Sequence, residues 1–105
     1  MPNNKIVIST ETLSVEAVLL ENSAAAQFKK ALPLTGSANI WGDEIYFSVN
    51  LEMELLESAT EVVESGNIAF WPPGHAFCIF FGLTPASTGT EIRAASPVNI
   101  LGHIH

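Results

Sequence analysis

Two apolar runs on either side of a Pro-Pro-Gly turn form the strongest pattern in the chain. The turn is Pro72-Pro73-Gly74, and the run from Ala76 to Phe81 is uncharged and rich in aromatic and β-branched residues. Such a run is typical of a strand buried on both faces. Because proline presets φ in a turn and glycine readily adopts a positive φ, we expect a central hairpin over residues 66–82 with the glycine at the positive φ.

Regular alternation of apolar and polar residues predicts further strands. It runs over residues 13–19 and, most cleanly, over residues 45–55, where every odd position is apolar. Since successive side chains of a strand point to opposite faces, Glu44 and Tyr46 share the even face. A strand this long usually bends or divides, and we expect the division near Asn50.

One segment has the pattern of a helix. Asn22 is a good N-cap, and the three alanines that follow Ser23 favour a helix over residues 23–32. Phe28 and Leu32 are four residues apart and share a face, so we expect them to dock the helix on the sheet. Pro33 ends the helix.

The remaining segments read as strands and loops. β-Branched runs over residues 5–10 and 97–104 predict the first and last strands, and Gly42 predicts a bulge or sharp bend. Residues 58–65 predict a short loop or single turn, and residues 83–91 a loop. Several strands, many turns and one short helix indicate a mostly β fold, a small closed or nearly closed antiparallel β-barrel with the helix at one end.

Composition and charge narrow the classes of function. The formal net charge is −7, from 11 acidic and 4 basic residues, which disfavours nucleic acids and anionic membranes as partners. Cys78 is the only cysteine, so no internal disulfide forms. No signal peptide and no uncharged run of membrane-spanning length is visible, and we expect a cytoplasmic protein. With 48% hydrophobic and 14% charged residues, the chain is expected to bury surface in a homodimer.

Four segments in order carry a resemblance to a known family. They are residues 40–47, 66–74, 77–85 and 96–102. Together they resemble the small cyclophilin-like domains of bacteria and archaea. The resemblance spans roughly residues 5–102 and implies a cyclophilin-type β-barrel without an established activity. It therefore agrees with the barrel that the alternation predicts independently.

Two departures from that family affect the expectations. Family members usually continue past the position of Gly102 into a closing strand, whereas this sequence ends at His105. The resemblance therefore implies a single domain over residues 1–105 that lacks a C-terminal closing strand or borrows one. Prolyl isomerases of this fold carry a Phe-His-Arg-type strand and a Gln-Gly-Gly segment, and neither motif is present here.

The candidate site is an aromatic-lined pocket for a small molecule or a short peptide. A Glu–Tyr pair among aromatic rings suits a small polar or cationic ligand. The alternatives are a divergent peptidyl-prolyl cis-trans isomerase, with Arg93 as the catalytic group, and a structural or oligomerisation module without a ligand. The predicted lining is Tyr46, Trp71, Phe80 and Phe81, with Glu44, His75 and Asn99 as polar contacts.

Three histidines raise the question of a metal site. His103 and His105 would share one strand face about 7 Å apart, a spacing that suits two metal ligands. The third ligand has no assignment, and His105 is the terminal residue. We therefore predict no metal site and no cofactor.

Overall fold

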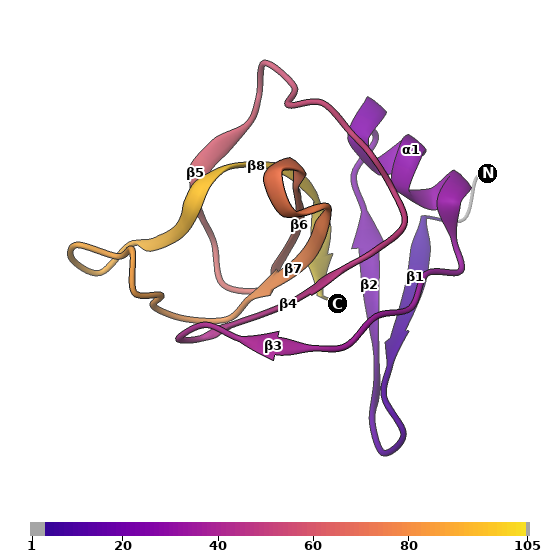
Figure 1. Ribbon diagram of the computed structural model, residues 1–105, viewed down its shortest axis with the longest axis horizontal. Coiled ribbons are helices and arrows are strands. Elements are labelled where there is room, and N and C mark those ends of the chain that lie inside the picture. The colour runs from indigo at the N-terminus through magenta and orange to yellow at the C-terminus, as the bar shows by residue number, and fades with distance from the viewer. Residues whose placement is uncertain (1–3, 105) are drawn as a thin grey trace.

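Residues 4–104, which the computed structural model describes, form eight strands, one α-helix and one short 3-10 helix (Figure 1). None of the helices in this range has the length and apolar character needed to cross a membrane. In chain order the elements are β1 (Lys5–Ser9), β2 (Ser14–Leu19), α1 (Ser23–Ala31), β3 (Asn39–Ile40), β4 (Glu44–Ser48), β5 (Thr60–Val63), β6 (Asn67–Trp71), η1 (Pro72–Gly74), β7 (Ala76–Phe80) and β8 (Ile92–Ile104).

The strands form one curled antiparallel sheet. Its order is β1-β2-β8-β6-β7-β4-β3, and β5 pairs with β8 outside that path. The long strand β8 pairs with β5 through residues 92–98 and with β2 and β6 through residues 99–104. Because one strand joins these partners, the sheet curls into a half-barrel, in which β5, β8, β6 and β7 surround a central space (Figure 1). The mostly β, nearly closed barrel predicted from the alternation is confirmed.

The central strands bury side chains on both faces of the sheet. In β7, Phe77 and Ile79 pack on the face toward α1, which we call the outer core. Cys78 and Phe80 pack on the face inside the curl, which we call the inner core. The prediction of a strand buried on both faces is confirmed for β7, but the run ends at Phe80, because Phe81 is 49% exposed.

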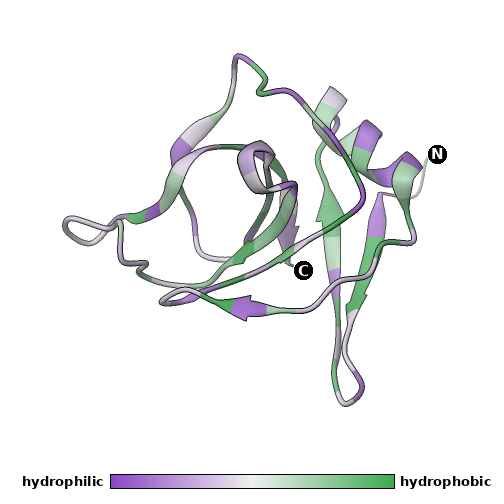
Figure 2. Ribbon diagram, in the orientation of Figure 1, coloured by the Kyte–Doolittle hydropathy of each residue, from purple (hydrophilic) through white to green (hydrophobic). Residues whose placement is uncertain are grey.

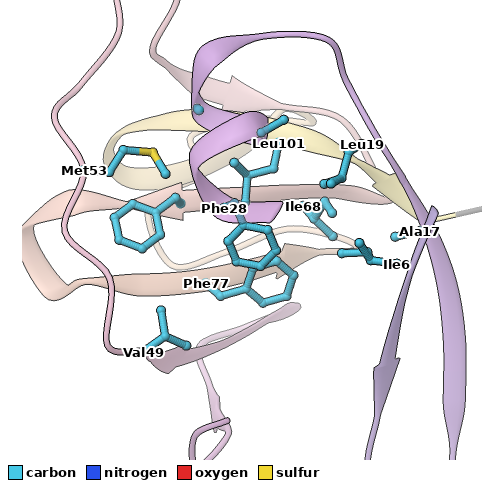
Figure 3. Close-up of a cluster of buried hydrophobic side chains, with 12 residues drawn as sticks. Ile6, Ala17, Leu19, Phe28, Val49, Met53, Ile68, Phe77 and Leu101 are labelled. Atoms are coloured by element: carbon cyan, nitrogen blue, oxygen red, sulfur yellow. The ribbon is translucent and has the colours of Figure 1, made fainter. Parts of the chain in front are cut away.

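Helix α1 closes the outer core. Asn22 caps its start, since its Oδ1 accepts a hydrogen bond of 2.7 Å from the backbone N–H of Ala25. Phe28 is buried and stacks on Phe77, with ring centroids 5.0 Å apart (Figure 3). Leu32 is partly buried against the same cluster. Hydrophilic and hydrophobic bands alternate along the helix in Figure 2, as one docked face requires.

The alternating stretch over residues 45–55 is only partly a strand. The ladder of β4 ends at Ser48, and residues 49–56 continue without strand pairing. Val49 and Met53 still reach the outer core, whereas Leu55 is 48% exposed. Asn99 of β8 holds this segment through its side chain, which bonds the backbone of Glu54 and Leu56. The prediction of strand structure after Asn50 was therefore wrong, since alternation alone does not supply a partner strand.

Three local predictions need correction. Residues 58–65 contain strand β5 rather than a loop or single turn, because β8 offers it a partner. Strand β8 begins at Ile92, before the predicted start at Pro97. In the central hairpin the positive φ of 49° belongs to His75, not to Gly74. Pro72 and Pro73 instead begin a 3-10 turn that ends at Gly74, and His75, which follows it, reverses the chain.

Candidate functional site

A cavity of about 220 Å3 lies among the inner-core strands. Strands β4, β6, β7 and β8 supply its walls, together with Trp41 from the turn before β4. Four of the lining residues are aromatic, one is acidic and none is basic. The lining residues are Trp41, Glu44, Tyr46, Trp71, Cys78, Phe80, Ala94, Ala95 and Val98.

Strand register brings four of these side chains to one face of the paired strands β4 and β7. Glu44 lies opposite Phe80, and Tyr46 lies opposite Cys78. Directly opposed residues of an antiparallel pair share a face, so all four point into the curl. Glu44, Cys78 and Phe80 are buried and form the floor, whereas Tyr46 is half-buried and Ala95 is exposed at the mouth.

A tight turn places Trp41 beside Glu44. The two residues exchange backbone hydrogen bonds of 2.9 and 3.1 Å between their N–H and C=O groups. Gly42 in this turn has a φ of +62°, and the backbone of Leu83 and Thr84 lies 2.9 Å from where a Cβ would be. Both the conformation and the space therefore require glycine, and the predicted sharp bend at Gly42 is confirmed.

The indole of Trp71 is held as a fixed wall. Its Nε1 donates a 2.7 Å hydrogen bond to the Oγ of Ser96, on strand β8. Gly74 lies against the ring, and a Cβ at that residue would come within 2.7 Å of it. The hydrogen bond and the contact with Gly74 restrict the rotamer of Trp71, so this part of the lining is preorganised.

The floor of the cavity holds an acidic residue that is almost fully buried. Glu44 is 6% exposed, and burial raises its pKa, while a hydrogen bond from the Cys78 thiol partly opposes this change. That thiol also lies 3.8 Å from the carbonyl oxygen of Ala76, and its single proton serves one acceptor at a time. Burial, followed by the charge of Glu44 and the hydrogen bond with it, raises the pKa of Cys78. Cys78 is therefore a protonated, unreactive thiol.

Comparison with known proteins identifies the family. The sequence model of the cyclophilin-like family matches residues 4–105. The chain belongs to the cyclophilin-like family. It is also similar to a hypothetical protein from Archaeoglobus fulgidus with a known solution structure, at 40% sequence identity and a TM-score of 0.82. That match covers 98% of this chain and 80% of the archaeal one. None of the curated proteins matches the sequence. The predicted resemblance is confirmed, and with it a fold whose function is unknown.

In this cyclophilin-like protein, four of the seven predicted ligand contacts lie together. Glu44, Tyr46, Trp71 and Phe80 all line the inner-core cavity. These residues come from three strands, and the alternation along β4 had already placed the first two on one face.

The other three predicted contacts lie elsewhere. His75 is exposed, and its Nδ1 is 3.1 Å from the carbonyl oxygen of Leu51, in the lining of a separate and more open hollow. Phe81 lies beyond the end of β7 and is 49% exposed. Asn99 is fully buried, and both ends of its amide bond the backbone of the segment after β4. The structure thus gives Asn99 a structural role.

Arg93 is held by two carboxylates rather than facing the cavity. Its Nε donates a 3.0 Å hydrogen bond to Glu91, and its guanidinium lies 3.8 Å from a carboxylate oxygen of Glu61. The backbone N–H of Thr88, and then Arg93, lower the pKa of Glu91 to about 2. Arg93 is therefore the centre of a surface ion-pair cluster next to the exposed loop before β8.

The histidines do not come together in the part of the chain that the structure describes. Over residues 4–104, no group of three histidine, cysteine or acidic side chains is arranged to hold a metal ion. His103 is exposed, near the end of β8, and His105 lies outside the described residues.

Five lining residues were not predicted. Trp41 stands three residues before Glu44 in the sequence, so the turn at Gly42 was a usable signal for it. Cys78 lies opposite Tyr46 in a register that the sequence does not reveal. Ala94 and Ala95 belong to the part of β8 before Pro97, which the sequence pattern did not predict as a strand. Val98 lies in the part of β8 that was predicted as a strand, but its position in the cavity depends on which strands pair.

Proposed function

We propose that this cyclophilin-like protein binds a small molecule in the inner-core cavity without catalysing a reaction. The single observation that carries the proposal is the buried carboxyl of Glu44 at the floor of an aromatic-lined hollow. Ligand sites typically combine apolar and aromatic walls with a few placed polar groups. A packed barrel without a ligand has no need of an ionisable group at that position, because burial opposes its charged form.

The size of the cavity favours a ligand smaller than a nucleotide. Its volume is about 220 Å3. Pockets for drug-sized ligands measure about 300–1,000 Å3. The exposed position of Ala95 and the half-buried Trp41 and Tyr46 provide a route by which a compact molecule enters.

The two alternatives receive less support. Prolyl isomerisation through Arg93 requires a guanidinium aimed at the substrate, and this one is engaged by Glu91 and Glu61. A purely structural role leaves the hollow and its carboxyl without a purpose.

The cytoplasmic location and the homodimer inferred from composition stay predictions. Light scattering that shows a monomer at high concentration would refute the homodimer.

A fragment screen by protein-observed NMR tests the proposal. We expect some compact fragments to shift the amide signals of Tyr46, Trp71 and Phe80. Ala95→Leu narrows the mouth and should weaken that binding, whereas Ala26→Leu, on an exposed helix position outside the curl, should not. A library that gives no shifts at these amides, or binding that is indifferent to Ala95→Leu, contradicts the proposal.

A further inference from the structure

We propose that the ligand of the inner-core cavity carries a methylated ammonium group, with Glu44 as its counter-ion and the aromatic rings as its cage. This inference rests on the small-molecule binding proposed above and names the chemical class of the ligand. It draws on three features of the lining: its charge, its aromatic walls and its supply of hydrogen-bonding groups.

The charge of the lining calls for a cation. Glu44 is the only charged residue among the nine that surround the cavity, and the residue is 6% exposed. Its one side-chain partner is the Cys78 thiol, a weak donor that also lies near another acceptor. A buried carboxylate is costly unless a cation or several donors accompany it. A positively charged ligand supplies what the protein leaves out.

The walls suit an organic cation. Trp41, Tyr46, Trp71 and Phe80 present four aromatic rings to one hollow. The face of an aromatic ring attracts a cation, tryptophan most strongly, and cages of such rings recognise quaternary ammonium groups. The indole of Trp71 is already fixed by Ser96, so little order is lost when a ligand enters.

The balance of aromatic and hydrogen-bonding groups distinguishes between kinds of cation. A divalent metal ion needs several oxygen, nitrogen or sulfur ligands, and the only charged ligand in the lining is one carboxylate. A primary ammonium has three N–H donors, which match the two carboxylate oxygens of Glu44 and the hydroxyl of Tyr46 but make no use of the four aromatic rings. A methylated ammonium has few or no donors and contacts ring faces through its methyl groups. Because aromatic residues outnumber the polar ones, the lining favours a methylated ammonium.

The test uses two probes of nearly the same shape. Choline carries a trimethylammonium group, and 3,3-dimethylbutan-1-ol replaces the charged nitrogen by carbon. The two tryptophans of the chain both line the cavity, so intrinsic fluorescence reports binding directly. At pH 8 we expect choline to bind at least about tenfold more tightly than the neutral alcohol, the factor that one modest cation–π and charge contribution supplies.

Two variants separate charge from shape. Glu44→Gln should weaken choline binding at least about tenfold and leave binding of the neutral alcohol unchanged. Glu52→Gln removes an exposed carboxylate outside the cavity and should change neither. In the unmodified protein, choline affinity should fall as the pH is lowered through the raised pKa of Glu44, because the carboxylate loses its charge. The other titratable groups in the lining are Cys78 and Tyr46.

The possible results distinguish the proposal of a methylated ammonium ligand from the broader proposal of small-molecule binding. Equal affinity for the two probes, or choline binding that Glu44→Gln does not weaken, refutes a cationic ligand and leaves the proposal of small-molecule binding intact. If the neutral alcohol binds more tightly than choline at low pH, the cationic ligand is also refuted, and a protonated Glu44 that donates a hydrogen bond explains the result. If neither probe binds, the methylated ammonium is overturned, and the fragment screen decides separately whether the cavity binds any ligand.

Discussion

Replacing Asn99 by alanine should destabilise the fold by removing the clamp that holds the segment after β4. The side chain of Asn99 is fully buried on β8. Its Oδ1 accepts a 2.9 Å hydrogen bond from the backbone N–H of Leu56, and its Nδ2 donates a 2.9 Å bond to the carbonyl oxygen of Glu54. Residues 49–56 have no strand partner, so these two bonds replace a ladder.

The magnitude follows from the number of bonds and the groups they leave behind. Each intramolecular hydrogen bond contributes about 1 kcal/mol net, and a buried group left unsatisfied costs about 1–3 kcal/mol. Because Leu56 is only partly buried, water reaches part of the vacated space, and we expect a total loss of about 2–4 kcal/mol for Asn99→Ala. For a chain of this length that lowers Tm by about 9–18 °C.

Urea denaturation and amide hydrogen exchange measure the effect. The urea midpoint of Asn99→Ala should fall with little change in the slope, and the amide of Leu56 should lose protection. Asn50→Ala, at an exposed position of the same segment, is the matched control and should change stability by less than about 0.5 kcal/mol. If Asn99→Ala matched this control and kept the Leu56 amide protected, the clamp would not be the reason for the burial of Asn99.

Three further predictions concern stability and titration. Because burial raises the folded-state pKa of Glu44, stability should fall as the pH rises through that pKa, and Glu44→Gln should remove this decline in urea midpoints measured from pH 4 to 9. NMR titration should place the pKa of Glu91 at about 2, held there by the N–H of Thr88 and by Arg93, and Arg93→Ala should raise it toward 4.5. The contribution of that carboxylate to stability is present above its unfolded pKa and is lost as the pH falls toward 2. Phe28→Ala should cost about 3–5 kcal/mol in urea unfolding, since the ring is buried and stacked in the outer core.

The central hairpin and the helix could be predicted from the sequence because their signals are local. The Pro-Pro-Gly turn and its apolar flanks define β6 and β7, although the positive φ falls on His75. Asn22 and Pro33 lie at the two ends of the helical pattern, and the structure places α1 between them. Family membership was also predictable, since four ordered segments carry it and the cyclophilin-like match spans residues 4–105.

The candidate site was likewise predictable only where the signal in the sequence is local. Alternation along one strand placed Glu44 and Tyr46 on one face without any knowledge of the fold, because a strand repeats every two residues. The composition also disfavoured a basic lining, because the chain has only one arginine and three lysines.

Only the tertiary structure decided which side chains meet across the cavity. Cys78 reaches Glu44 through the register of β4 with β7, and Ala94 arrives on a long β8 whose early part pairs with β5. The fate of Asn99 was decided in the same way, by a backbone segment more than forty residues earlier in the chain. Register and non-local hydrogen bonds depend on which strands come together, and a period of two in one strand carries no information about its partner.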